Sequence, residues 1–206
     1  MYALVEDNEV KQIITNPKAM VIEDVRYPAK IFQLWSQSEL NAIGIYEVIT
    51  DLSNHKDEAY YINTNEEYNF ADGQVTRSWG IATAKELNDS LWTQQDSDDG
   101  DLPDDKEVGD VKVEGLKTQK KRIVKQQASG LLAPTDWYVV KANEVSEYNV
   151  PENITTYRAD VRAKSNEMET QIDACTNVDE LKALYEYTRQ EDGTQTRPLA
   201  EFPKEI

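Results

Sequence analysis

Few side chains of this sequence could do chemistry, and the two most reactive types occur once each. His55 is the only histidine and lies in the polar stretch 53–57, whose residues supply no defined nucleophile for it to activate. Cys175 is the only cysteine, so the chain can form no internal disulfide and no cysteine-based zinc site. Cys175 also falls on an apolar helical stripe, where thiols are commonly buried and inert. We therefore predict no catalytic residue, no metal-binding residue and no cofactor.

A run of acidic residues at 96–110 is the other candidate for chemistry, with eight acids, one base and a net charge of −7. Asp96, Asp98 and Glu107 match positions one, three and twelve of a calcium-binding EF-hand loop, but Asp101 stands where that loop needs glycine. Like charges at this density repel one another, which favours an extended, solvated linker. Calcium binding by this run, or a small hydrolase that uses His55, is kept as a remote alternative function.

The overall charge excludes several classes of partner. The 206 residues contain 39 acidic and 22 basic side chains, a formal net charge of −17. Phosphate backbones and anionic membranes would repel such a chain, so we predict neither a nucleic-acid nor a membrane partner. No apolar window approaches the roughly 18 residues that cross a bilayer, and the acidic N-terminus lacks the features of a signal peptide. We expect the protein in a reducing cytoplasm or in a particle assembled there.

The pattern of elements predicts an α+β protein in four parts. They are a small β-rich domain with one short helix at 1–92, an acidic linker at 93–111, a helical module at 112–189 and an extended tail at 190–206. In the first part we expect a hairpin of 2–5 with 10–14, a strand at 45–49, and a second hairpin of 60–62 with 75–81 across the turn Asp72-Gly73. Ser36 and Glu39 form a capping box before a helix that Gly44 ends.

Helical periodicity dominates the second half. One amphipathic helix ends at Pro134, and a longer one begins at Pro151. We expect their apolar stripes to consist of Leu116, Ile123, Val124, Ala128, Leu131 and Leu132 in the first helix, and of Ile154, Tyr157, Val161, Met168, Ile172 and Cys175 in the second. A third helix is expected from 177 to about 187, capped by Thr176 and Asp179.

The first of these helices also carries the one basic island of the chain, consisting of Lys117, Lys120, Lys121, Arg122 and Lys125. It could meet an acidic partner, fold back on the acidic linker or bind nucleic acid. The last of these three is the poorest reading, because the rest of the chain is strongly acidic.

A resemblance covers roughly residues 115–185. After the first helix come LLAPTDWYV at 131–139 and VPENITTYRADVR at 150–162, followed by TNVDEL at 176–181. This order resembles the C-terminal module of tailed-bacteriophage tail-fibre assembly proteins and related small tail proteins. In that module a helix leads to Leu-x-x-Thr-Asp-Trp, and a proline opens a second helix that bears Tyr-Arg-x-x-x-Arg. Segments 27–36, 40–46 and 73–79 are similar to N-terminal pieces common in phage tail proteins.

The motif residues predict a structural clamp rather than a site of chemistry. Thr135 and Asp136 can hydrogen-bond local backbone and fix the turn after the first helix. We expect Trp137, with Tyr138 beside it, to be a buried anchor between the two helices. Tyr157, Arg158 and Arg162 then lie one to two turns into the second helix. Arg158 and Arg162 lie four residues apart on one helical face, where Asp136 is the natural counter-ion.

The resemblance implies a non-enzymatic phage tail protein that binds tail or tail-fibre subunits as an assembly chaperone or accessory. The alternative is a structural component of the tail or baseplate that stays in the virion. The implied location is the host cytoplasm during assembly, or the virion tail, and self-association is left open. An acidic mimic of nucleic acid is a further alternative, but its charge would have to cover a folded face instead of concentrating at 96–110.

Overall fold

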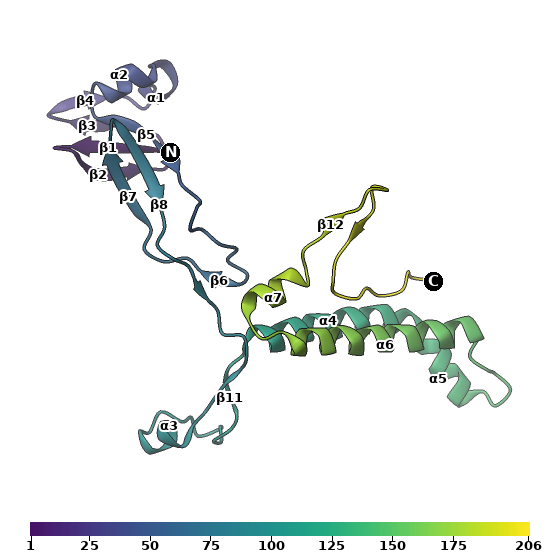
Figure 1. Ribbon diagram of the computed structural model, residues 1–206. Helices are drawn as coiled ribbons and strands as arrows, with labels where there is room; N and C mark the ends of the chain where they lie inside the picture. Colours follow the sequence, from purple (N-terminus) through teal and green to yellow (C-terminus); the bar gives the residue numbers. More distant parts are fainter. The chain divides into compact units, whose positions relative to one another are not determined.

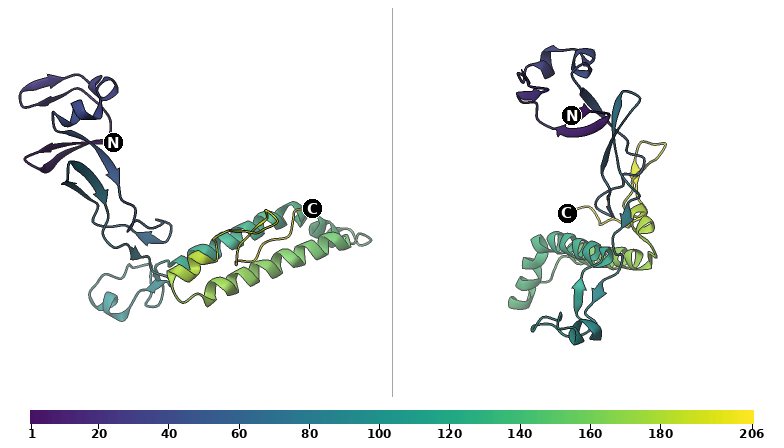
Figure 2. Two further views of the ribbon diagram at one scale, coloured as in Figure 1. Left: turned by 45° about the horizontal axis from the view of Figure 1, so that its top comes forward. Right: turned by 90° about the vertical axis from the view of Figure 1, so that its left-hand side faces the viewer.

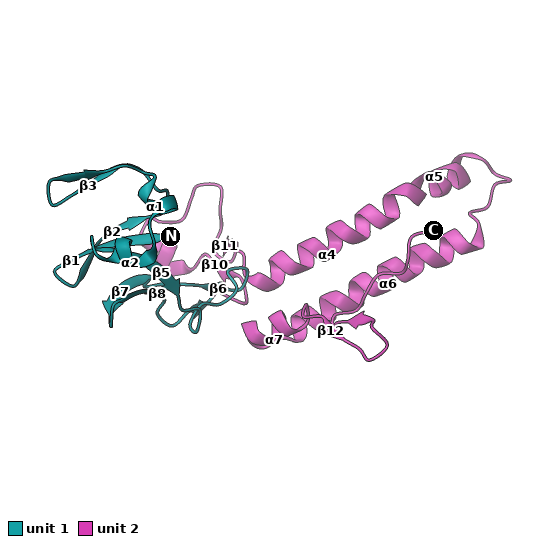
Figure 3. Cartoon of the chain, turned by 90° about the horizontal axis from the view of Figure 1, so that it is seen from above, with its two compact units in different colours: residues 1–84 teal, residues 85–206 magenta.

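A computed structural model describes residues 1–206, which divide into two compact units, Met1–Ala84 and Lys85–Ile206 (Figures 1 and 3). The first unit is a sheet with small helices and the second is mainly helical. The predicted α+β class is therefore confirmed. The first unit ends at Ala84, before the predicted boundary at 92, and the acidic run falls inside the second unit.

A five-stranded sheet in the order β2-β1-β5-β8-β7 forms the first unit. β5 and β8 are parallel, and the other neighbouring strands are antiparallel. The sheet curls, so that its edge strands β2 and β7 contact each other. The strands are β1 (Tyr2–Glu6), β2 (Glu9–Ile14), β5 (Ile45–Thr50), β7 (Glu67–Ala71) and β8 (Gln74–Ser78).

Two tight turns organise this sheet. The predicted β1–β2 hairpin is confirmed, and the residues of its turn, Asp7 and Asn8, have φ of 51° and 61°. The predicted turn at Asp72-Gly73 is also present, but the strand before it is β7 and not 60–62. A two-residue turn can only join the strands that adjoin it. Residues Tyr61–Ile62 (β6) pair instead with Thr83–Ala84 (β9).

Short elements cover one face of the sheet. They are the hairpin of β3 (Met20–Ile22) with β4 (Val25–Tyr27), α1 (Ile31–Leu34) and α2 (Gln37–Asn41). The predicted capping box is confirmed, since the Ser36 hydroxyl accepts from the Glu39 N–H and the Glu39 carboxylate accepts from the Ser36 N–H. Gly44 follows with a φ of 80°, and a Cβ there would lie 2.6 Å from the Val5 carbonyl oxygen.

Alternation along β1 divides the apolar side chains between two clusters. Leu4 packs with Ile45 and Leu40 on the face that the small elements cover. Ala3 and Val5 point into the curl of the sheet, where Val75 is fully buried. Successive side chains along a strand of the sheet therefore point alternately to one apolar cluster and to the other.

Two antiparallel helices, α4 (Leu116–Leu132) and α6 (Glu152–Ala174), form the second unit (Figures 1 and 2). Between them lie a 3-10 helix, η1 (Ala133–Thr135), and α5 (Asp136–Glu144). The predicted stripe of the second helix is confirmed, because all six of its members are buried. In the predicted stripe of the first helix, Leu116, Val124 and Ala128 are buried. Ile123 is exposed, because it directly precedes Val124 in the helix and therefore points away from the buried face.

The acidic run is not an extended linker. β10 (Ser90–Leu91) pairs with β11 (Val111–Val113), and α3 (Gln94–Asp98) lies between these strands. A second capping box starts α3, with Thr93 and Asp96 in the two roles. Asp96 also forms an ion pair with Lys112. The capping hydrogen bonds and the ion pair with Lys112 thus offset enough of the negative charge for local structure to form. The charge density of the acidic run alone did not predict this structure.

The two ends of the acidic segment are fastened to the start of α4. Asp89 accepts a hydrogen bond from the Gly115 N–H at 2.7 Å and another from the Thr118 hydroxyl at 2.8 Å. The carboxylate therefore satisfies the free N–H of Gly115, the N-cap residue of α4, and meets the positive end of the helix dipole. Residues 93–111 are consequently a side excursion of the second unit and not a connection between units.

The chain ends with α7 (Val178–Ala183) and a small hairpin of β12 (Thr188–Arg189) with β13 (Gln195–Thr196). Asn177 caps α7, in place of the predicted Thr176 and Asp179, since its side chain accepts from the Glu180 N–H at 2.9 Å. The final residues then run back along α6, in yellow in Figure 1. None of the helices has the length and apolar character needed to span a bilayer.

Candidate protein-binding site

A buried arginine organises the end of the helical pair. Arg158 lies in the first half of α6 and is 8% exposed. Its guanidinium donates to the Leu132 carbonyl at 3.0 Å and to the Thr135 hydroxyl oxygen at 2.5 Å, and it pairs with the Asp136 carboxylate at 2.8 Å. The side chain therefore holds together the last carbonyl of α4, the 3-10 helix and the first residue of α5. The predicted Asp136–Arg158 pair is present.

Two further predicted residues complete this clamp. Thr135 is buried, and its hydroxyl donates to the Leu132 carbonyl at 2.7 Å while it accepts from Arg158. Tyr157 is buried against Ala128 and Val161. The C-terminal carbonyls of a helix lack partners within the helix, so these bonds satisfy groups that would otherwise need water. The clamp fixes the direction in which the chain leaves α4.

Trp137 is not the buried anchor that the motif predicted. It lies on α5 with 52% of its surface exposed, and α5 has no buried residue. The prediction failed because Pro134 does not reverse the chain. Its ring is accommodated in the first turn of the 3-10 helix, and α5 then continues before the chain turns back after Glu144.

The exposed indole belongs to a small cluster at this end of the unit. Its ring centroid lies 3.8 Å from that of Tyr138. The ammonium of Lys141 lies 6.0 Å from the Trp137 ring and 4.3 Å from the Tyr148 ring. Val140, one helical turn after Trp137, is also exposed. We call Trp137, Tyr138, Val140, Lys141 and Tyr148 the α5 patch.

The structure thus separates the predicted site residues into two groups. Thr135, Asp136, Tyr157 and Arg158 form the clamp, while Trp137 and Tyr138 belong to the exposed patch. Arg162 stays outside both, since it is exposed and donates only to the Arg158 carbonyl at 3.3 Å. The sequence reading missed the other three members of the patch. Their signal was the spacing of Trp137, Val140 and Lys141, which already predicts one face of a helix.

The basic island is matched within its own unit. Lys121 pairs with Asp173 at 2.7 Å, Lys125 with Glu169 at 3.3 Å, and Lys117 donates to the Asp173 carbonyl at 2.9 Å. These acceptors lie on α6, so the island fastens α4 to α6 and does not fold back on the acidic run. Lys117 also meets the negative end of the α6 dipole.

His55 and Cys175, which have the two most reactive types of side chain, both make structural contacts. The His55 ring lies edge-on to Trp79 at 4.7 Å between centroids, and its Nε2 is 3.4 Å from the Asn63 amide nitrogen. The Glu58 carboxylate lies 3.8 Å from the same Nε2. Cys175 is buried and donates to the Gln171 carbonyl at 3.4 Å. Burial raises the pKa of its thiol, which lowers the fraction of reactive thiolate.

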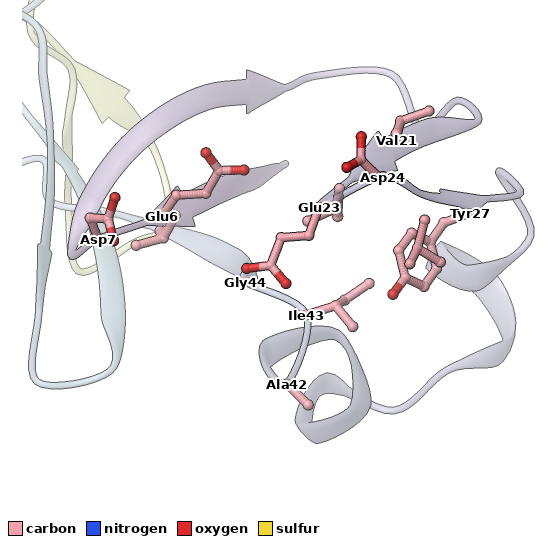
Figure 4. A pocket seen from close by; sticks show the side chains of 12 residues that line it. Glu6, Asp7, Val21, Glu23, Asp24, Tyr27, Ala42, Ile43 and Gly44 are labelled. Carbon is pink, nitrogen blue, oxygen red and sulfur yellow. The ribbon is translucent and has the colours of Figure 1, made fainter.

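The first unit contains a cavity of about 720 Å³ beside the β1–β2 and β3–β4 turns (Figure 4). Four acidic residues line it, namely Glu6, Asp7, Glu23 and Asp24, with Ile43 on its wall. Carboxylates at this density would repel an anionic ligand. No group of three or more His, Cys, Asp or Glu side chains in the chain is placed to hold a metal ion.

The remaining comparison is with other proteins. No protein-family model, curated protein sequence or solved structure matched this chain. Functional inference therefore depends on the geometry of the clamp and the α5 patch, together with the resemblance in sequence described above.

Proposed function

We propose that the chain is a non-enzymatic bacteriophage tail protein that binds tail or tail-fibre subunits, as an assembly chaperone or accessory. The main support for this proposal is the α5 patch, which the clamp holds in position. Tryptophan and tyrosine dominate the energetics of protein interfaces because they bury much surface with few rotatable bonds. Here the indole is half exposed on a helix that buries none of its residues.

Rigidity strengthens this argument. The Arg158 bonds to Leu132, Thr135 and Asp136 fix the start of α5 before any partner arrives. A preorganised anchor loses less conformational freedom on binding, so more of its contact energy appears as affinity. The residues that resemble the phage module are thus the same residues that position the patch, which supports a common role in subunit binding.

The net charge of −17 is typical of a protein that stays soluble without its partner and binds that partner selectively. Repulsion keeps copies apart and opposes adsorption to nucleic acid, whereas the patch itself contains the positive charge of Lys141. The proposed partner surface is therefore apolar at its centre, with acidic groups able to meet Lys141 at its rim.

Deletion of the reading frame from the phage that encodes it tests the proposal. We expect particles that lack fibres or tails, and rescue by the wild-type chain and by Ile123→Ala, which alters an exposed apolar side chain outside the patch. Trp137→Ala should not rescue. Normal particles from the deletion phage would contradict the proposal.

Mass spectrometry of purified particles separates the two versions of this function. Absence of the chain from mature virions supports a chaperone that leaves after assembly. Stoichiometric presence supports the alternative, a structural component of the tail or baseplate.

A further inference from the structure

The C-terminal segment of this chain occupies a surface on the helical pair as an extended peptide. Beyond Thr196 it has no helix or strand. Leu199 is nevertheless buried, 2% exposed, and Phe202 packs against the cluster of Ala128, Tyr157 and Val161 between α4 and α6. The sequence predicted an extended tail, and the structure shows this segment packed on its own unit.

The main chain of the segment is recognised as well as its side chains. The Gln171 side chain, on α6, donates to the Pro198 carbonyl at 3.0 Å and accepts from the Ala200 N–H at 2.8 Å. The Leu199 N–H donates to the Leu184 carbonyl at 3.0 Å. An amide that bonds both sides of one residue reads extended backbone without regard to side chain. Sequence selection is therefore left to the positions that Leu199 and Phe202 fill.

Two side chains carry the recognition, since Lys204 shares a shallow pocket with Glu152 and Asp160 but is exposed and forms no ion pair. The surface thus accepts a leucine and an aromatic residue three positions later. We name it the tail groove, lined by Ala128, Tyr157, Asp160, Val161 and Gln171.

We propose that the tail groove is a peptide-binding site, in which residues 197–204 act as a built-in competitor for an extended Leu-x-x-aromatic segment of another protein. The competitor is suited to displacement, because few contacts hold it: the buried Leu199, the half-buried Phe202 ring, the Arg197 guanidinium 5.2 Å from the Tyr187 ring, and three main-chain hydrogen bonds. A second copy is the weaker occupant, since each chain carries a charge of −17 and two copies repel.

Tethering sets the size of the effect. A segment joined by a short connection is present at an effective concentration of about 1 mM. A free peptide with a dissociation constant of about 1 to 10 μM for the open groove would therefore bind the intact chain about 100- to 1000-fold more weakly. The inference concerns a surface other than the α5 patch and does not depend on the tail-protein function.

The test uses the full chain and a fluorescein-labelled peptide of residues 196–206. The double variant Leu199→Ala/Phe202→Ala removes the competitor and leaves the groove unchanged. We expect it to bind the peptide at least 100-fold more tightly than the wild-type chain does. Ile206→Ala, which alters an exposed apolar residue of the same segment, should behave as the wild type. A peptide with both alanine substitutions should not bind.

Equal peptide affinity in the double variant and the wild type would overturn the proposal, and so would a wild-type chain that forms dimers through exchanged tails. Hydrogen exchange of the wild-type chain decides the matter if the double variant does not fold. The Leu199 and Ala200 amides should exchange at least tenfold faster than the Val161 amide in α6. Exchange at one common rate would show that the segment belongs to the folding core, which overturns the proposal.

Discussion

Replacement of Arg158 by alanine tests the clamp most sharply. The guanidinium donates two hydrogen bonds, to the Leu132 carbonyl and the Thr135 hydroxyl, and each bond from a charged donor contributes about 1.5 to 3 kcal/mol. The ion pair adds less than about 1 kcal/mol, because the Asp136 side chain is 59% exposed. Relief of the buried charge offsets part of this sum. We expect Arg158→Ala to lower the free energy of unfolding by about 3 kcal/mol.

The matched control lies one helical turn away. Arg162→Ala removes the same type of side chain from an exposed position of α6, and should change stability by less than about 0.5 kcal/mol. Asp136→Ala should cost less than about 1 kcal/mol. Urea unfolding followed by far-UV circular dichroism reports on the helical unit in all three variants. Equal midpoints for Arg158→Ala and Arg162→Ala would refute the assignment of the clamp.

Three further outcomes follow from the structure. Hydrogen bonds from Lys112 and Thr93 hold the pKa of Asp96 well below its usual range. The stability that these bonds give the fold is therefore complete above the ordinary pKa of about 3.9, and it is lost as the pH falls through the lowered pKa. An NMR titration of the Asp96 carboxyl should find its midpoint below 3.9, and a midpoint at or above that value would exclude this bonding. Gly44→Ala should destabilise the first unit by about 2 kcal/mol or more, because of the left-handed φ and the nearby Val5 carbonyl, whereas Gly130→Ala in α4 meets open space and should stabilise by about 0.5 to 1 kcal/mol. Thermal unfolding of the two variants should therefore shift in opposite directions. Cys175 should react with a thiol reagent in urea but hardly at all in the native chain, and fast native labelling would show that the C-terminal end of α6 opens readily.

Elements whose cause lies in nearby residues could be predicted from the sequence. The stripe of α6 repeats over more than six turns, so its buried side was correct at every predicted position. The β1–β2 hairpin and the capping box of α2 were correct for the same reason, since residues within a few positions determine each of them.

Elements that depend on partners distant in the sequence were predicted less well. The ends of the acidic excursion are held by Asp89 and by pairing of β10 with β11, which charge density within 96–110 could not reveal. The β3–β4 hairpin was missed because its strands have three residues each. The tail groove depends on Gln171 and Leu199, which no local pattern connects.

The sequence predicted the ion pair of the candidate site correctly but placed Trp137 wrongly. The counter-ion role of Asp136 followed from opposite charge in one motif, and the structure contains that pair. The placement of Trp137 required knowledge of where the chain reverses. Pro134 favoured reversal at once, but proline also fits the start of a helix, and α5 follows.

Photo-crosslinking from position 137 in phage-infected cells tests the central claim most directly. A chain with a photoreactive phenylalanine analogue in place of Trp137 should, on irradiation, form one covalent product with a tail or tail-fibre subunit, identified by mass spectrometry. The same analogue at position 123, on the exposed side of α4, should not form that product. A tail-subunit product from position 123 and none from position 137 would contradict the account.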